Sequence, residues 1–327
     1  MGSPLRPPTA ASSAMTRGTV VAVVGATATG KTALAAVLAR ALGAEIVCAD
    51  SRQVFAELEI GTGRPTPVER SQWPHHLFGA LQLGQHASAG WYARAAHDAC
   101  DAIAARGRPA ILVGGSGLYL KALREGLAAT PPHDPAVRER LRAELAERGA
   151  EALHARLATV DPASAQRLAP RDRQRVSRAL EVYEATGRPL SWWHARPPVA
   201  GPARDGAVFE VVVEPAELRR RIESRTAWML DHGLIEETRA LRAGGHEPAL
   251  KALRAIGYDE TLDLLDGRLD RRGAEERINL RTAQLAKRQR TWFRHQIEAL
   301  RLDATLRTPE QLAEAARAAL RDAGRAG

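Results

Sequence analysis

The sequence predicts an α/β fold: a P-loop-containing parallel sheet flanked by helices, with an all-helical insertion domain and a helical C-terminal region. Three observations predict it. Strand-like and helix-like segments alternate over residues 20–130, which is typical of a parallel sheet. A glycine-rich loop follows the first strand-like run and precedes a helical one. Residues 131–198 hold no strand-like run, and strand character returns at 207–213.

The composition sets the broad class of protein. The 327 residues are 45% hydrophobic and 26% charged, which is ordinary for a soluble globular chain with a core and an insertion. Two cysteines, Cys48 and Cys100, are too few for a disulfide framework, and no apolar run reaches membrane-spanning length, so we expect a cytoplasmic protein without a membrane partner. The net charge of +9 is mostly arginine and permits a polyanionic partner, although arginine richness can also reflect genome composition.

The N-terminal segment is expected to stand apart from the fold. Residues 1–18 lack the apolar stretch of a signal peptide and are predicted to form a disordered leader. The start codon is then either Met1 or Met15.

The first structural element contains a phosphate-binding motif. An apolar, β-branched run at 20–24 predicts a strand, and apolar residues at helical spacing after the loop predict a helix ending at Gly43. In such a unit, backbone N–H groups and a helix N-terminus converge on an anion. The Lys31 ammonium adds charge, and the Thr32 hydroxyl is a candidate magnesium ligand. The segment Gly25-Ala26-Thr27-Ala28-Thr29-Gly30-Lys31-Thr32 matches G-x-x-x-x-G-K-[ST] at each fixed position and predicts a di- or triphosphate site.

The next elements continue the sheet. A short strand at 45–49 ends at Asp50, and a Gly/Pro-rich loop follows at 59–67. A helix is expected to end near Gly107, before a third strand at 110–113 and a glycine turn at 114–117. The carboxyl ends of parallel strands share one edge of a sheet, so the P-loop, Asp50 and this turn should lie together.

The rest of the chain is predicted to be mainly helical. One helix begins with Asp134 as N-cap and stops at Gly149, and another spans 171–187. After the strand at 207–213, a long helix is expected from about 274 to 300. The predicted domains are a P-loop core of 19–130 and 205–327, which includes the helical C-terminal region, and a helical insertion of 131–204 that is a candidate for nucleic-acid binding.

Asp50 is the candidate general base. An ATPase would usually present a Walker-B carboxylate well downstream of the P-loop, but here the strand at 110–113 ends in two glycines and Ser116. Asp50 is the strand-terminal carboxylate near the loop, and it is well placed to accept a proton from a nucleophile attacking a group bound there. The alternatives are that Asp50 caps a helix or orients a magnesium ligand from the second coordination shell.

Two helices are candidates for nucleic-acid contact. Arginines and one glutamine share a face opposite apolar residues in the helix at 171–187, and this face suits an RNA backbone with Gln174 reading a base edge. A solvated charged face is the other interpretation. Aromatic residues of the second helix are more often core than stacking platforms, and Trp192 and Trp193 are also expected in the core. The residues of these faces are Arg171, Arg175, Arg178 and the amide Gln174 in the first helix and Lys287, Arg290 and Arg294 in the second.

These motifs, in this order, resemble those of the tRNA dimethylallyltransferases (tRNA isopentenyltransferases) of the IPP transferase family, in their bacterial form without a C-terminal Cys/His finger. The resemblance runs from about residue 20 to residue 300. The departures are Ala26, Thr29, Ser116 and Arg64, where the family more often has Pro, Ser, Thr and Lys. The segments that carry it are GATATGKT, DSRQVF, EIGTGRP, HHLF, LVGGSGLYLKAL, RDRQRVSRALEVYEATGRPLS, RIESR, LRAIGYDE and QLAKRQRTWFR.

The resemblance implies an activity and a set of roles. The reaction is transfer of a dimethylallyl group from dimethylallyl diphosphate to N6 of the adenosine 3′-adjacent to the anticodon, with Mg²⁺ as cofactor and the tRNA anticodon stem-loop as partner of a monomeric enzyme. The P-loop residues 25–32 and Arg225 then hold the diphosphate, Thr32 the metal, and Asp50, Thr27, Lys31, Ser116 and Arg225 are catalytic. The implied tRNA contacts are Asp50, Ser51, Arg52, Gln53, Ser116, Arg138, Gln174, Arg175, Val176, Ser177, Arg178, Arg254, Ala255, Ile256, Gly257, Tyr258, Asp259, Thr282, Lys287, Arg288 and Gln289.

Three other functions compete with this one. A P-loop small-molecule kinase could use Asp50 to deprotonate a hydroxyl, but it leaves the basic C-terminal region unexplained. A non-catalytic nucleic-acid-binding protein leaves Asp50 and Ser116 idle. An adenylate dimethylallyltransferase shares the P-loop chemistry but has no need of the basic faces at 174–178 and 287–294.

Overall fold

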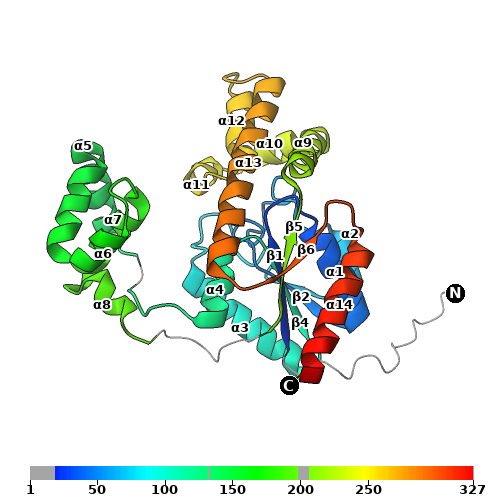
Figure 1. The fold of residues 1–327 in the computed structure, drawn as a ribbon. Coiled ribbons are helices and arrows are strands. Elements are labelled where there is room, and N and C mark those ends of the chain that lie inside the picture. The colour runs from blue at the N-terminus through cyan, green and yellow to red at the C-terminus, as the bar shows by residue number, and fades with distance from the viewer. Residues whose placement is uncertain (1–18, 132, 198–205, 327) are drawn as a thin grey trace. The chain divides into compact units, whose positions relative to one another are not determined.

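The computed structural model describes residues 19–131, 133–197 and 206–326, so the expected leader and the choice between Met1 and Met15 lie outside the described residues. The chain forms two compact units (Figure 1). One, which we call the core unit, comprises Met1–Arg124 and Arg204–Gly327, and the other, the inserted unit, comprises Glu125–Ala203.

The core unit contains one six-stranded sheet in which each pair of neighbouring strands is parallel. Its order is β3-β2-β4-β1-β5-β6, so the strand before the P-loop lies between β4 and β5. Parallel pairing brings the carboxyl ends of β1, β2 and β4 to the same edge, where the polar motifs follow. The strands are β1 Val20–Gly25, β2 Glu45–Cys48, β3 His75–His76, β4 Ala110–Gly114, β5 Val208–Val212 and β6 Leu300–Asp303.

Both faces of the sheet are covered at its centre, which is why β1 and β4 are continuously apolar. In β1, Val21 and Val23 pack on the side of α1 (Lys31–Leu42) and α14 (Pro309–Ala326). Val20, Ala22 and Val24 pack on the other side, in a core that includes α3 (Ala89–Ala105) and α4 (Gly117–Glu125). Figure 1 shows these two pairs of helices on opposite sides of the strands.

The remaining helices of the core unit follow β5, except for α2. A helical group that includes α9 and α13 joins the same core as α3 and α4. Within the described ranges, no helix has both the length and the apolar character needed to cross a membrane. These helices are α2 Pro67–Gln72, α9 Pro215–Asp231, α10 Leu234–Ala243, α11 Glu247–Leu253, α12 Tyr258–Leu265 and α13 Arg271–Gln296.

Two strands were not predicted from the sequence. β3 is two residues long, and β6 lies where the long helix was expected to continue to residue 300. The helix α13 instead ends at Gln296, and Leu302 is the one fully buried residue of β6. β6 is an edge strand with a single buried side chain, so its sequence lacks the apolar run that marks the central strands.

The inserted unit is a small helical core in the described residues. Its helices are α5 (Pro135–Val160), α6 (Pro162–Arg167), α7 (Arg173–Thr186) and α8 (Leu190–His194). The predicted N-cap is confirmed, because the Asp134 carboxylate accepts from the N–H groups of Ala136 and Val137. The expected stop at Gly149 is a break with left-handed φ of 80°, after which a second helical stretch continues to Val160.

Trp192 and Trp193 are not the core residues they were expected to be. Both are only partly buried, and they contact each other edge to face. The Trp192 ring lies under the guanidinium groups of Arg188 and Arg196, 5.2 and 3.1 Å from its centroid. The core of this unit comes instead from leucines and valines of α5 and α7.

Candidate active site

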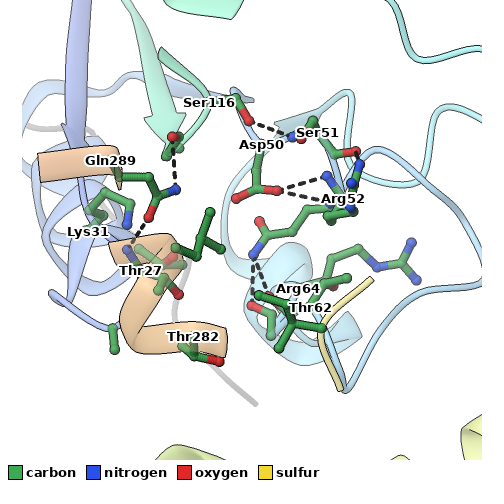
Figure 2. A pocket seen from close by; sticks show the side chains of 18 of the residues that line it. Thr27, Lys31, Asp50, Ser51, Arg52, Thr62, Arg64, Ser116, Thr282 and Gln289 are labelled. Atoms are coloured by element: carbon green, nitrogen blue, oxygen red, sulfur yellow. Dashed lines mark hydrogen bonds between the residues drawn. The ribbon is translucent and has the colours of Figure 1, made fainter. Parts of the chain in front are cut away.

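A cavity of about 1310 Å³ opens at the carboxyl edge of the sheet, within the core unit. Its wall combines the P-loop, the residues after β2 and β4, the loop at 61–65, and one side each of α9 and α13. Figure 2 shows side chains from these segments converging on it. The prediction that the P-loop, Asp50 and the glycine turn meet is confirmed.

The P-loop has the geometry expected of an anion cradle. Ala28 and Gly30 both have positive φ, 63° and 90°, in a turn that aims successive backbone N–H groups to one side. The Thr29 hydroxyl donates to the Ala26 carbonyl oxygen at 2.9 Å and closes the loop from within. Of the predicted diphosphate ligands, Thr27, Ala28, Gly30, Lys31 and Thr32 line the cavity, whereas Gly25, Ala26 and Thr29 are buried and shape the loop.

Two cations face the cavity and donate to uncharged oxygens. Lys31 Nζ donates to the Ala26 carbonyl oxygen, and burial lowers the pKa of this ammonium to about 8 despite the raising effect of Asp50. Arg225 of α9 donates to Thr27 Oγ1 at 3.2 Å and to the Thr62 carbonyl oxygen at 2.9 Å. Burial lowers the pKa of Arg225 too, against the attraction of Asp50. The attraction of a bound anion would offset the free-energy cost of removing both cations from water.

Asp50 lies at the end of β2, on the wall opposite the P-loop. One oxygen, Oδ1, accepts from the backbone N–H groups of Arg52 at 2.9 Å and Gln53 at 3.4 Å. These bonds close a turn at 51–54, so the capping role held open for Asp50 is present, in a turn and not in a helix. Figure 2 shows the second carboxylate oxygen on the P-loop side, so the same residue can also act as a base.

Ser116 supports the turn that presents Asp50. Its Oγ accepts from the Ser51 N–H at 2.9 Å, which joins the end of β4 to the end of β2. Ser116 lines the cavity, as predicted for a residue that orients a substrate. Its hydroxyl hydrogen can still donate to a ligand because the bond to Ser51 uses an oxygen lone pair.

The residues present fit a magnesium ion only together with diphosphate oxygens. The carboxylates that line the cavity are Asp50 and Glu69, and Glu69 accepts from the Thr66 N–H at 2.7 Å. Over residues 19–131, 133–197 and 206–326 there is no group of three or more His, Cys, Asp or Glu side chains placed to hold a metal. Mg²⁺ commonly binds through few protein ligands plus phosphate oxygens, which suits Thr32 beside a bound diphosphate.

Most of the predicted tRNA contacts of the core unit line this cavity, but several side chains are committed elsewhere. Ala255 and Tyr258 are buried, and the Tyr258 hydroxyl donates to Glu237. Arg52 donates to the Leu253 carbonyl oxygen at 2.8 Å. The predicted contacts that line the cavity are Asp50, Ser51, Arg52, Gln53, Ser116, Arg254, Ala255, Ile256, Gly257, Tyr258, Thr282, Arg288 and Gln289.

Two predicted contacts of the core unit lie outside the cavity. Lys287 is exposed, and Asp259 forms an ion pair with Arg281 at 2.9 Å. Burial raises the pKa of Asp259, while Arg281 opposes that effect.

The cavity face of α13 differs from the basic face that sequence analysis singled out. The face predicted from Lys287, Arg290 and Arg294 does not line the cavity. Phe293 is buried, as favoured for this helix, whereas Trp292 reaches the cavity wall. The residues of α13 that line the cavity instead recur at heptad-like spacing. This spacing is visible in the sequence, but the prediction followed the positions of the basic residues. The cavity-lining residues of α13 are Ile278, Arg281, Thr282, Gln284, Leu285, Arg288, Gln289 and Trp292.

The inserted unit treats its predicted contacts unequally. Gln174, Arg175 and Arg138 are exposed and accessible to RNA, and Ser177 is partly buried. Val176 is 1% exposed and belongs to the core, so its side chain cannot contact tRNA. Arg178 is largely used inside the unit, because it donates to the Pro131 carbonyl oxygen at 2.6 Å and pairs with Glu181 at 3.2 Å.

Taken together, the phosphate-binding motif, the parallel sheet and the cationic cavity define an α/β protein of the P-loop class. Comparison with known proteins identifies the family. The model of the IPP transferase family matches residues 53–296, and the isopentenyl transferase model matches residues 18–74.

Individual relatives agree with the family models. A tRNA dimethylallyltransferase of Rhodopseudomonas palustris (strain BisB18) is 45% identical over 298 residues, covering 90% of this chain and 94% of the relative. A full-length tRNA isopentenylpyrophosphate transferase of Bacillus halodurans is similar in structure, with TM-score 0.67 and 30% identity over 94% of this chain and 98% of that one. A eukaryotic dimethylallyltransferase crystallised acting on tRNA gives TM-score 0.75 at 26% identity, over 88% and 74% of the two chains. The chain belongs to the IPP transferase family.

Proposed function

We propose that this protein transfers the dimethylallyl group of dimethylallyl diphosphate to the exocyclic N6 amine of the adenosine 3′-adjacent to the anticodon in tRNA. The observation that carries the proposal is that two half-buried cations, Lys31 and Arg225, line the same cavity as the carboxylate of Asp50. The activities for which the relatives are named, tRNA dimethylallyl and isopentenylpyrophosphate transfer, point the same way. The products are N6-dimethylallyladenosine in tRNA and diphosphate.

The cationic side of the cavity suits the leaving group. As the allylic C–O bond breaks, its electron pair goes to the diphosphate oxygen, so negative charge grows next to Lys31, Arg225 and the loop N–H groups. Thr27 Oγ1 accepts from Arg225 and keeps its own hydrogen for donation to the diphosphate. Thr32 would hold Mg²⁺ beside the diphosphate, and the ion would supply further neutralisation of that charge.

Asp50 suits the nucleophile. An exocyclic adenine amine is a weak nucleophile because its lone pair is delocalised into the ring, and forming the new C–N bond leaves a proton to be removed. The oxygen of Asp50 on the P-loop side can take that proton, while Oδ1 stays fixed by two backbone N–H groups. Charge is then conserved: the amine proton goes to Asp50 and the leaving electron pair to diphosphate.

The size of the cavity suits a large second substrate. A volume of about 1310 Å³ exceeds the roughly 300–1,000 Å³ of a usual small-ligand site, which leaves room for a nucleoside beside a prenyl diphosphate. A base can enter such a cavity only after it leaves the anticodon-loop stack, so base flipping is part of the proposal. The exposed Gln174, Arg175 and Arg138 of the inserted unit supply additional contacts to the RNA backbone.

The setting of the reaction is also proposed. Cys48 and Cys100 are buried thiols that are not joined in a disulfide, which suits a reducing compartment such as the cytoplasm. We propose a monomer, which light scattering of the purified protein tests.

The experiment is a transfer assay with radiolabelled dimethylallyl diphosphate, Mg²⁺ and an unmodified tRNA bearing adenosine at the target position. Wild type should label that tRNA and neither a tRNA lacking this adenosine nor free AMP. Asp50→Ala should lose about 10²–10⁴-fold in kcat, and Asp98→Ala, which removes an exposed carboxylate of α3, should not. Label in AMP would shift the assignment to an adenylate dimethylallyltransferase. ATP consumption with a small alcohol, without prenyl transfer, would support a kinase.

A further inference from the structure

Gln289 of α13 joins two loops that are distant in the sequence. Its Oε1 accepts from the Thr27 N–H of the P-loop at 2.9 Å. Its Nε2 donates to the carbonyl oxygen of Gly115, after β4, also at 2.9 Å. Figure 2 shows the side-chain amide spanning the space between them. One oxygen lone pair and one N–H of the amide are therefore used within the protein, and these two bonds fix the orientation of the amide toward the two loops.

The glycine turn after β4 is shaped to receive this helix. A Cβ on Gly115 would lie 2.4 Å from Gln289 Nε2, and a Cβ on Gly117 would lie 2.1 Å from Trp292 Cε3. Real Cβ atoms do not approach other atoms so closely, so a Cβ at either position would force the Gln289 amide or the Trp292 ring to move. The turn resembles a phosphate loop in sequence, but two of its glycines serve the approach of Gln289 and Trp292.

The contact fixes Thr27 from both sides. Gln289 holds its backbone N–H, and Arg225 of α9 holds its hydroxyl at 3.2 Å. The Thr27 N–H therefore points at α13 and is not one of the donors directed at an anion. Ala28, the next residue of the loop, has left-handed φ. The position of Thr27 therefore sets the positions of the N–H groups that follow it in the loop.

We propose that Gln289 is a positioning residue for diphosphate binding: it sets the P-loop from α13, and it is not a direct tRNA contact. The inference rests on the proposed function, because it concerns the diphosphate substrate of that reaction. It changes the role that the family resemblance implies for this position. In this proposal, α13 also holds the P-loop in place. Its Thr282 and Arg288, which are proposed tRNA contacts, line the same cavity.

The test separates the two substrates. Gln289→Met keeps the length of the side chain and removes both hydrogen bonds. Binding of inorganic pyrophosphate with Mg²⁺ and without tRNA is measured by calorimetry, and KM is measured for each substrate. We expect the Kd of pyrophosphate and the KM of dimethylallyl diphosphate to rise about tenfold, since two hydrogen bonds are lost, while the KM of tRNA stays unchanged. Lys287→Met, an exposed neighbour outside the cavity, should change only the tRNA side.

The opposite pattern overturns the proposal. A raised KM of tRNA with an unchanged Kd of pyrophosphate would make Gln289 a tRNA contact, and no change in either would make it incidental. If wild type itself transfers no prenyl group to tRNA, the proposed function fails instead. Pyrophosphate binding is measured without turnover, so the two failures are distinguishable.

A second pair of variants keeps the test valid if Gln289→Met folds poorly. Gly115→Ala places a methyl group against Gln289 Nε2, so it should raise the Kd of pyrophosphate like Gln289→Met. In a Gln289→Ala background the methyl group has space, and Gly115→Ala should add little more. Fully additive effects of the two substitutions would overturn the proposal.

Discussion

The P-loop cavity of the core unit and the helices of the inserted unit use positive charge in opposite ways. At the P-loop, Lys31 and Arg225 donate to carbonyl and hydroxyl oxygens. The Asp50 carboxylate attracts both cations without forming a salt bridge to either of them. In the inserted unit, arginines of α5 and α7 contact carboxylates directly, as in Arg156 with Glu144 at 2.6 Å and with Glu184 at 2.7 Å.

The difference separates cations that are available to bind an anion from cations that already stabilise the fold through carboxylates. A buried cation without a contacting carboxylate is costly, and a bound anion offsets that cost. An arginine that already pairs with glutamate has little to gain from a phosphate. Counting arginines on a helix face therefore overstates its affinity for RNA, and Arg178 illustrates this because Glu181 holds it.

The largest expected effect tests the core side of this comparison. Lys31→Ala should lower kcat/KM for dimethylallyl diphosphate by about 10²–10³-fold, because it removes a charge aimed at the leaving group. Lys31→Arg should not restore it, since the larger, planar guanidinium does not fit where the Lys31 ammonium contacts the Ala26 carbonyl oxygen. Steady-state kinetics with saturating tRNA measures both. A loss of only a few-fold would mean that Lys31 behaves like a surface charge.

The next effect concerns stability of the inserted unit. Glu181, 3% exposed, accepts from His133 Nδ1 at 2.8 Å and from the Asp134 N–H at 2.9 Å, besides pairing with Arg178. Glu181→Gln should lower local stability by about 2–4 kcal/mol, because an amide N–H₂ then meets groups that donate.

Hydrogen exchange of α7 amides in the full chain measures this loss. Protection of α7 should fall, while protection of the β1 amides stays the same. Glu139→Gln, whose exposed pair with Arg142 is at 2.6 Å, serves as the control. Equal protection in both variants would refute a structural role for the Glu181 cluster.

The third effect is a pH dependence confined to the core unit. Burial sets the pKa of Lys31 near 8, and only the protonated form attracts diphosphate. Then kcat/KM for dimethylallyl diphosphate should fall about tenfold per pH unit above pH 8 and stay level just below it. The profile of Lys31→Ala should lack this inflection. An unchanged inflection in that variant would assign it to another group.

The smallest effect is expected on the inserted side. Arg175→Ala should raise the KM of tRNA about five-fold and lower the salt dependence of binding by about one ion, because it removes one exposed phosphate contact. Arg142→Ala, another exposed arginine of the unit, is the control, and binding titrations at several salt concentrations measure both. An Arg175→Ala effect as large as that of Lys31→Ala would erase the contrast between the units.

Local patterns predicted much of the core unit. The P-loop, the ends of β2 and β4, and the strand that resumes at Val208 follow from apolar runs punctuated by glycine, and the structure has them within one or two residues. β6 escaped prediction because an edge strand with one buried residue carries almost no pattern. Trp192 escaped because burial depends on the neighbours that fold against a side chain.

The sequence by itself determined where the phosphate loop and the strand-terminal carboxylate proposed for the chemistry stand, because both are local signatures that neighbouring residues encode. It could not determine how those residues are held. The bonds from Gln289 to Thr27 and Gly115, and from Arg225 to Thr27, join segments separated by 262, 174 and 198 positions in the chain. Such contacts exist only after the sheet and helices have packed, and no periodicity along the chain records them. Only the tertiary structure shows that Gly115 and Gly117, after β4, pack against α13. Only the tertiary structure shows that Arg178 donates to a carbonyl oxygen of the inserted unit.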